Sequence, residues 1–448
     1  MRIRLYALLS VAVLALGLAA PVSAHEDDPP PPTPGNGPDL HSDNVSLIET
    51  SWQTDHPNTD LAFWHDTAYA GNFGGFRVLD ISDPAHVKEL ADVDCYGYHS
   101  DMEVWGDLLF QTIDRPLTSP GCDGVSTTYD ETPDAWEGMR VWDVSDPTAP
   151  RLVKSVRVDC GVHNESVLPD VRNGRVYVYA ASYPLSYFNP HCQQPRGEFA
   201  IVEVPLDDPG SAHVAATPPV DAPPFYGAVG CHDFTFYTPK HLAAASCLSE
   251  GQLWDVSDPL HPVVLNHIDN DGVDVWHGAA FTWDGKYVIF GDEYFGNPGC
   301  DVPPLASMWA YSVADPSEPL SRWSLPKRRD GEYGCTPHFF ATMPSTTGYF
   351  VVSSYYEGGM DVVDFTDITD PHEVAYYDAQ QPVSANEWSA YWYNGNIYAN
   401  DIVRGVDVFA LDDPQITLGV ERLSHLNPQT YDRVIPLAHD LEQAAADG

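Results

Sequence analysis

The stretch "FRVLDISDP" at residues 76–84 decides the fold, because variants of it recur along the chain. Each copy is a run of alternating apolar residues that ends in an Asp-Pro turn. Proline presets the turn backbone, and the aspartate before it can accept hydrogen bonds from turn amides. The other six copies are "MRVWDVSDP" (139–147), "AIVEVPLDDP" (200–209), "GQLWDVSDP" (251–259), "MWAYSVADP" (308–316), "DVVDFTDITDP" (361–371) and "VDVFALDDP" (406–414). Seven copies of one unit predict a repeat architecture.

The setting of each copy predicts a four-stranded sheet. Two strands precede it, as in "VRNGRVYVYAAS" (171–182) and "FTWDGKYVIFGDE" (281–293), where Asn-Gly or Asp-Gly marks a hairpin. One more apolar run follows it, as in "HPVVLNHI" (261–268). Small sheets of this kind bury both faces when they stack radially. The sequence therefore predicts an all-β chain that folds as a seven-bladed β-propeller of four-stranded antiparallel blades.

The ring of blades also needs to be closed, and two segments compete for that role. "NVSLIETSW" (44–52) resembles a fourth strand that has no first three strands before it. "ITLGVERLS" (416–424) already lies on the C-terminal side. We favour the N-terminal segment as the outer strand of the seventh blade, so that the two ends of the chain pair and hide an open sheet edge.

The motifs "VLDISDP" and "VWDVSDP" give the chain a resemblance to the LVIVD-repeat family of secreted β-propellers, over roughly residues 45–425. The resemblance implies the propeller fold and export from the cell. It implies no activity, because the family is defined by its repeat. Function must therefore be argued from the residues of this chain.

The N-terminus has the pattern of a secretory signal peptide. Arg2 and Arg4 precede an apolar run, and "VSA" ends at Ala24 with the small residues of a cleavage site. We expect a signal peptide at 1–24, a disordered linker rich in proline and acid at 25–44, the propeller at 45–425 and a C-terminal tail at 426–448. No other stretch is long enough for a membrane span. The expected location is extracellular.

The charge balance limits the partners. The chain has 21 basic and 65 acidic residues, which gives a formal net charge of −44. Nucleic acid and anionic membrane surfaces need a basic face, so neither is an expected partner. No stretch matches the EF-hand calcium loop. We expect a monomer whose ligand is a small molecule, a glycan or a protein.

Eight cysteines in an exported chain favour four disulfides over thiolate metal sites. In a propeller, the start of a blade's first strand and its second-to-third-strand loop open on the same face, and all eight cysteines fall at such positions. Disulfides need close Cα atoms. The pairs for which proximity is easiest are Cys95–Cys122, Cys160–Cys192, Cys231–Cys247 and Cys300–Cys335.

Histidines mark the beginnings of successive inner strands, which converge on the axis of a propeller. They are His56, His99, His163, His232, His277 and His338, with Glu387 at the same place in the seventh unit. Nearby acids on the same face are Asp60, Asp101, Glu165, Asp233, Asp292, Glu293 and Asp401. Neutral imidazole suits zinc, copper, iron and nickel, and carboxylates can orient the rings. The pattern predicts a divalent transition-metal site at the mouth of the axial channel.

Two other interpretations stay open. A histidine repeated in every blade can bond neighbouring backbone each time and be purely structural. A scaffold without metal could bind a glycan, peptide or envelope component through the loops that the disulfides hold.

Catalysis is also left open. The chain has no GxSxG elbow and no glycine-rich phosphate loop. A copper-type oxidoreductase is suggested only by a loose likeness to the selenium-binding protein and methanethiol oxidase group, whose motifs are not matched. A glycosidase needs two opposed acids, for which Asp292, Glu293 and Glu387 are candidates.

Overall fold

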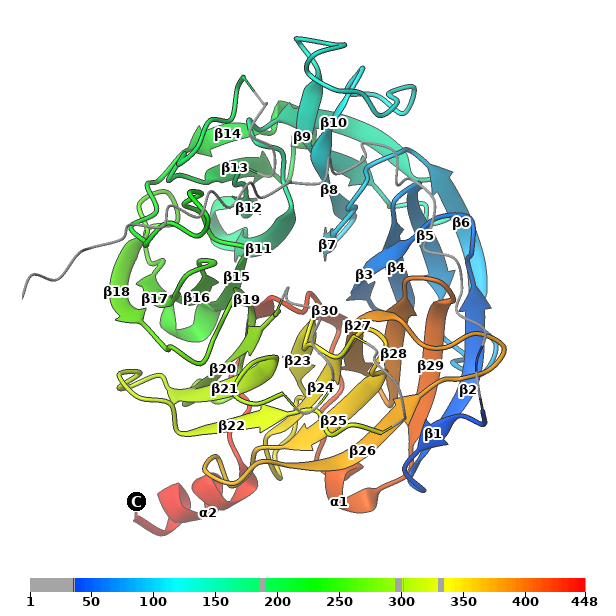
Figure 1. The fold of residues 1–448 in the computed structure, drawn as a ribbon, viewed down its shortest axis with the longest axis vertical. Helices are drawn as coiled ribbons and strands as arrows, with labels where there is room; N and C mark the ends of the chain where they lie inside the picture. Colours follow the sequence, from blue (N-terminus) through cyan, green and yellow to red (C-terminus); the bar gives the residue numbers. More distant parts are fainter. Residues whose placement is uncertain are drawn as a thin grey trace, which may run out of the picture.

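The computed structural model describes residues 35, 37–184, 190–294, 300, 302–328 and 334–447. Seven small antiparallel sheets are arranged like blades around one axis (Figure 1). The predicted seven-bladed β-propeller is therefore confirmed. The expected signal peptide at 1–24 and residues 25–34 of the expected linker lie outside the described residues. No helix in the described part of the chain is long and apolar enough to cross a membrane.

In blades 1 to 6 the strands follow chain order from the innermost first strand to the outermost fourth strand, and in blade 7 the outermost strand comes from the N-terminal segment. Blade 1 is β3 (Asn58–Trp64), β4 (Thr67–Asn72), β5 (Gly75–Asp80) and β6 (Lys88–Asp94); blade 2 is β7 (Met102–Trp105), β8 (Leu108–Leu117), β9 (Trp136–Asp143) and β10 (Arg151–Arg157); blade 3 is β11 (Asn164–Asp170), β12 (Arg175–Ala181), β13 (Ala200–Pro205) and β14 (His213–Ala216). Blade 4 is β15 (Asp233–Tyr237), β16 (Leu242–Ser246), β17 (Gly251–Asp255) and β18 (Val263–Ile268); blade 5 is β19 (Trp276–Phe281), β20 (Tyr287–Asp292), β21 (Ser307–Ser312) and β22 (Ser321–Ser324).

Blade 6 is β23 (Phe340–Thr342), β24 (Phe350–Ser354), β25 (Met360–Asp364) and β26 (His372–Asp378); blade 7 is β27 (Glu387–Tyr393), β28 (Asn396–Asp401), β29 (Gly405–Leu411) and β2 (Val45–Trp52). The few helical turns are η1 (Val171–Asn173), η2 (Pro209–Ser211), η3 (Thr238–Lys240), α1 (Pro414–Thr417) and α2 (Ala438–Asp447).

The repeated motif forms the third strand of each blade and the turn that follows. In the first copy, Asp80 Oδ1 accepts a hydrogen bond from the Ser82 amide at 3.0 Å, and Asp83 Oδ1 accepts one from the Ala85 amide at 3.2 Å. The copy in blade 4 repeats the first contact between Asp255 and Ser257 at 2.8 Å. The aspartates of the motif therefore hold the turn, as expected from its sequence.

Apolar side chains of neighbouring blades pack against one another to form the core. Between blades 3 and 4, for example, Phe199 lies 4.6 Å from Phe234 and 5.6 Å from Trp254, measured between ring centroids. All three are at most 1% exposed. Both faces of each sheet are thus buried, which is what a radial stack of sheets requires.

The N-terminal segment closes the ring, as predicted. β2 pairs antiparallel with β29, with Val45 opposite Leu411 and Trp52 opposite Gly405. β1 (Leu40–His41) adds a short outer strand to β26. The competing segment 416–424 does not pair there; it begins within α1 and continues as a loop.

Residues 423–435 form what we call the axial strap, which crosses the inner strands of blades 1 to 5. β30 (His425–Leu426) pairs with β3, and β31 (Thr430–Tyr431) lies parallel to β15. Asn427 bonds both backbone groups of Val104 in blade 2. Ile435 donates its amide to Trp283 O, just after β19. The strap is the red chain near the centre of Figure 1. It pairs with the last residues of β3 and β15, whereas the predicted histidines lie at the starts of the inner strands.

Candidate functional site

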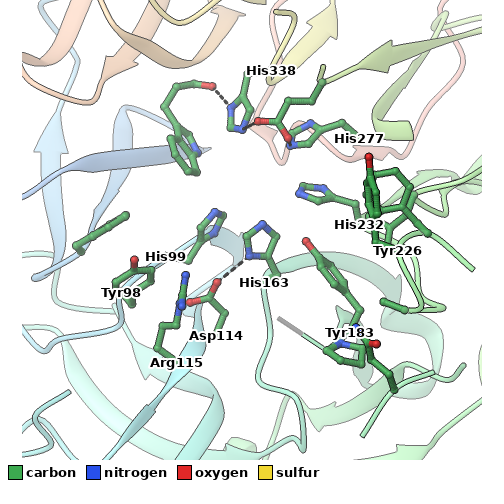
Figure 2. Close-up of a pocket in the computed structure, with 18 of the residues that line it drawn as sticks. Tyr98, His99, Asp114, Arg115, His163, Tyr183, Tyr226, His232, His277 and His338 are labelled. Carbon is green, nitrogen blue, oxygen red and sulfur yellow. Dashed lines mark hydrogen bonds and ion pairs between the residues drawn. The ribbon is translucent and has the colours of Figure 1, made fainter. Parts of the chain in front are cut away.

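A cavity of about 460 Å³ opens at the start of the inner strands. Figure 2 shows the side chains that line it. The lining polar and charged groups are His99, Asp114, Arg115, His163, Gln194, His232, His277, Glu293 and His338. The lining apolar and aromatic residues are Phe73, Tyr98, Tyr183, Pro184, Phe225, Tyr226, Ala228, Leu248, Tyr356 and Trp388. A volume of this size is typical of small-molecule sites.

Five imidazoles and one indole form a closed ring around the axis, one from each of blades 2 to 7. The centroid distances between neighbours are 4.0 Å for His99–His163, 4.8 Å for His163–His232, 3.8 Å for His232–His277, 4.5 Å for His277–His338, 4.5 Å for His338–Trp388 and 4.9 Å for Trp388–His99. The sequence predicts the five histidines at one mouth, and the structure brings them together there.

Two of the five imidazoles are oriented by an acceptor at Nδ1. His163 Nδ1 lies 2.7 Å from Asp114 Oδ2, and His338 Nδ1 lies 2.6 Å from the carbonyl oxygen of Trp388. A neutral ring that donates from Nδ1 keeps its lone pair on Nε2. A carboxylate or carbonyl on the second nitrogen is the usual support of a metal-binding histidine.

Glu293 lies between the histidines of blades 4, 5 and 6. His277 Nε2 is 3.3 Å from Glu293 Oε2, and His338 Nε2 is 3.9 Å from Oε1. Tyr356 donates its hydroxyl to Oε1 at 2.7 Å. His232, His277 and Glu293 each offer one ligand atom, and these three atoms lie within 4.8 Å of one another. These three residues are the geometric centre of a candidate metal site.

Burial controls the charge of these groups. Desolvation, followed by the neighbouring imidazoles, holds the pKa of His99, His232 and His277 well below its ordinary value. Burial lowers the pKa of His338 to about 3 and raises the pKa of Glu293 to about 8. The four imidazoles are therefore neutral near pH 7, which is the protonation state that binds a metal. Glu293 is largely protonated at that pH and releases its proton when it binds a metal.

Two predicted members lie outside the ring. His56 packs on Gly74, where an added Cβ would lie 2.2 Å from His56 Cδ2. Glu387 begins β27, and successive residues of a strand point to opposite faces. Its neighbour Trp388 therefore takes the place in the ring, and Glu387 faces away from it.

Glu387 belongs instead to a buried group with Asp401 and Asp407. Arg404 pairs with Asp407 through Nε at 2.7 Å and Nη2 at 3.1 Å. Asp401 accepts backbone amides from Asn386 at 2.6 Å and from Val403 at 2.8 Å. A guanidinium occupies Asp407 and backbone amides occupy Asp401, whereas both carboxyl oxygens of Glu387 are buried without a hydrogen-bond partner. None of the three residues lines the axial cavity.

A second set of acids lies along the inner strands, beyond the histidines. This carboxyl layer consists of Asp60, Asp101, Glu103, Glu165 and Asp233, all at most 2% exposed. Burial raises the pKa of Asp60 to about 6 and of Asp233 to about 7, and that of Glu103 and Glu165 well above the ordinary range. The carboxyl oxygens of Glu103 and Glu165 have no hydrogen-bond partner. These residues lie in the inner strands β3, β7, β11 and β15 or directly before β7, and none of them lines the cavity.

Asp292 has a local role. Its carboxylate accepts the backbone amides of Asp274, Val275 and Ala306, each at 2.9 Å. These bonds hold the loops that flank blade 5. Asp292 thus shapes the wall behind Glu293 and does not reach into the cavity.

The sequence reasoning did not single out Trp388, Glu103, Arg115 or Tyr356, nor the aromatic lining residues Phe73, Tyr98, Tyr183, Phe225 and Tyr226. Glu103 could have been found, because it lies in β7 two residues after Asp101, and residues two apart in extended backbone share a face. Strained backbone also collects here: Tyr98, Tyr226, Leu248 and Tyr356 line the cavity with positive φ of 64°, 46°, 60° and 46°. Strain of this kind concentrates at functional sites.

The disulfides hold the same face together. They join Cys95 to Cys122, Cys160 to Cys192, Cys231 to Cys247 and Cys300 to Cys335, and these are the four predicted pairs. Cys231 directly precedes His232, and Cys160 lies three residues before His163. The cross-links therefore fix the loops that carry the ring.

Comparison with known proteins supports the repeat assignment. The LVIVD repeat model matches residues 60–95 and 133–158. Those ranges contain the third strands of blades 1 and 2, and the predicted resemblance is confirmed. The sequence matches no curated protein. Among solved structures, the computationally designed Ika8 protein aligns over 84% of this chain and 100% of its own, at 14% identity and a TM-score of 0.45.

Proposed function

We propose that this β-propeller with LVIVD repeats is a metal-binding protein, which holds a divalent transition-metal ion in its axial cavity. His232, His277 and Glu293 are the proposed primary ligands. His163 and His338 flank them in the ring and can complete the ligand set. Imidazole with one carboxylate suits zinc, copper, iron or nickel.

One observation carries the proposal: donor atoms of His232, His277 and Glu293 lie within 4.8 Å of one another, and all three side chains are buried. A set of neutral imidazoles with one carboxylate, taken out of water, is a strong arrangement for a transition metal. The bonds of His163 to Asp114 and of His338 to Trp388 supply the outer support that such a site needs.

The competing explanation is that the histidines only bond their surroundings. The 3.3 Å contact between His277 Nε2 and Glu293 would serve that purpose. However, the Nδ1 atoms of His277 and His99 are buried without a hydrogen-bond partner. Structural polar groups in a protein interior are normally satisfied. Unpartnered imidazole nitrogens beside a cavity favour a ligand over a packing role.

Export is part of the proposal. Four disulfides are typical of proteins that mature in an oxidising compartment. The N-terminal sequence has the pattern of a signal peptide that ends at Ala24. We propose that the mature chain works outside the cytoplasm and binds its partner at the face that the disulfides hold.

The test is elemental analysis of the mature protein, purified without an affinity tag or added metal. We expect near-stoichiometric transition metal in the parent and its loss in the double variant His232→Ala, His277→Ala. The matched control is His86→Ala with His261→Ala, two exposed histidines that each bond only a turn aspartate. Circular dichroism checks that the fold survives. A parent without metal, or a double variant that retains it, would overturn the proposal.

A further inference from the structure

Arg115 is the only Lys or Arg among the described residues that line the cavity. Its guanidinium lies over the Tyr98 ring, 4.5 Å from the centroid, and its Nε is buried without a hydrogen-bond partner. No ion pair joins it to another described residue. An arginine normally satisfies its planar fork with carboxylate, phosphate or carbonyl oxygens. This one presents an unused cationic fork to a cavity.

The stacking of rings holds Arg115 in place. Tyr98 lies between Arg115 and Phe73, whose ring centroid is 4.6 Å from that of Tyr98. The Tyr98 backbone has a positive φ of 64°. A side chain supported in this way loses little conformational entropy when it binds a ligand.

The wall opposite Arg115 is aromatic and apolar. It contains Tyr183, Phe225, Tyr226 and Leu248. Phe225 and Tyr226 pack edge to face at 4.6 Å, and Tyr226 is 80% exposed at the cavity mouth. Figure 2 shows Arg115 and Tyr98 on one side of the histidines and Tyr183 and Tyr226 on the other. A planar apolar ring can pack against this wall.

We infer that the cavity binds a small aromatic carboxylate, with the carboxylate on Arg115 and the ring on the wall of Tyr183, Phe225 and Tyr226. The inference rests on the proposed function, because it places the ligand of that site beside the proposed metal. The match is one of charge and shape: a single guanidinium pairs best with a monoanion, in a fork-to-fork contact.

The charge of the chain bears on the choice between a monoanion and a dianion. With a net charge of −44, the protein repels anions at a distance, so a surface patch would not collect them. A dianionic phosphate carries twice the charge of a carboxylate and is repelled more strongly, while the cavity offers it only one guanidinium. A monoanion with a hydrophobic ring gains apolar burial as well as the ion pair, and a cavity of about 460 Å³ has room for it.

The test uses isothermal titration calorimetry on the mature protein with benzoate as the probe. Three comparison ligands each change one property of benzoate. Benzamide has no charge, cyclohexanecarboxylate has no aromatic ring, and phenyl phosphate has twice the charge. We expect benzoate to bind most tightly of the four. In Arg115→Gln, benzoate affinity should fall about 10- to 100-fold, since a hydrogen-bonded charge pair is lost. Arg115→Lys keeps the charge but not the planar fork, so its benzoate affinity should lie between that of the parent and that of Arg115→Gln.

The control is Arg322→Gln, because Arg322 also lies over an aromatic ring, that of Trp309 at 5.6 Å, but on the outer strand β22. It should bind benzoate as the parent does. Equal binding of benzamide or phenyl phosphate, or unchanged affinity in both Arg115 variants, overturns the carboxylate assignment. Equal binding of cyclohexanecarboxylate overturns the aromatic one.

Metal content is measured in every sample, so that the two proposals fail separately. Retained metal without benzoate binding contradicts only this inference. Benzoate binding without metal contradicts only the metal proposal.

Discussion

His163 in blade 3 and Asp114 in blade 2 are joined by a 2.7 Å contact between Nδ1 and Oδ2. Asp114 lies in β8, directly after the residue at which regular pairing with β9 ends, and His163 directly precedes β11, so the bond crosses the boundary between two blades. It orients one imidazole of the ring and links the ring to the neighbouring sheet.

Asp114→Asn is therefore expected to weaken metal binding while leaving the fold intact. The amide can still accept a bond from Nδ1–H, but it no longer raises the basicity of the imidazole as a carboxylate does. Loss of an outer-shell partner typically costs about 10- to 100-fold in metal affinity. Competition with a chelator of known affinity measures this. The control is Asp143→Asn, whose carboxylate pairs with exposed Arg151; unchanged affinity in Asp114→Asn would contradict the prediction.

Asp60→Asn is expected to stabilise the protein at neutral pH. Burial raises the Asp60 pKa from 3.8 to about 6, so the folded state binds a proton more tightly than the unfolded chain. Above pH 6 both states are ionised, and the folded state carries the full cost of the buried charge, roughly 3 kcal/mol. That cost shrinks as the pH falls toward 4. Asparagine avoids it and still accepts the Tyr391 hydroxyl bond, which is 2.6 Å long in the parent.

Urea unfolding at several pH values measures this difference. The gain from Asp60→Asn should be largest above pH 6 and vanish near pH 4. Asp146→Asn should show the opposite trend, because the Thr148 side chain and amide lower the Asp146 pKa by hydrogen bonding. A gain that does not vary with pH would show that charge burial is not its cause.

Asn427→Ala is expected to destabilise the propeller. Asn427 Oδ1 accepts the Val104 amide at 2.9 Å, and Nδ2 donates to Val104 O at 2.7 Å, in a site that is 1% exposed. Alanine leaves both backbone groups unsatisfied, at a cost of about 2–4 kcal/mol. Thermal and urea unfolding measure the loss. Asn173→Ala, at an exposed turn, should change stability little; an equal effect there would contradict the role of the strap.

Replacing both Cys95 and Cys122 by serine is expected to lower the free energy of unfolding by about 3–4 kcal/mol, because the bond closes a loop with a sequence separation of 27. The Cys231–Cys247 bond, with a separation of 16, should give a slightly smaller loss. Unfolding without reductant measures both. A loss below about 1 kcal/mol in each case would contradict the argument from loop closure.

The sequence was sufficient for the architecture because each blade repeats the same local chemistry. The Asp-Pro turn after every third strand marks the blade number, and a lone fourth strand at 45–52 marks the closure. Cysteine positions within the blade were enough to pair the disulfides, because strand order fixes which loops share a face.

The exact membership of the ring depends on side-chain direction, which a strand position gives only to within one residue. In blade 7 the sequence pattern predicted Glu387 as the ring member, whereas in the structure the side chain of Trp388 points to the axis. In blade 1, His56 packs on Gly74 instead. The axial strap carries no repeat and no periodicity, so its contacts with five blades could be seen only in three dimensions.

The pairing of β2 with β29 also sets an order of events during synthesis. β2 is made first, and its partner is available only when nearly the whole chain has emerged. Contacts so distant in sequence form late in folding. Any chain that is terminated or cut before residue 405 therefore keeps two unpaired strand edges, and such fragments are prone to associate with one another.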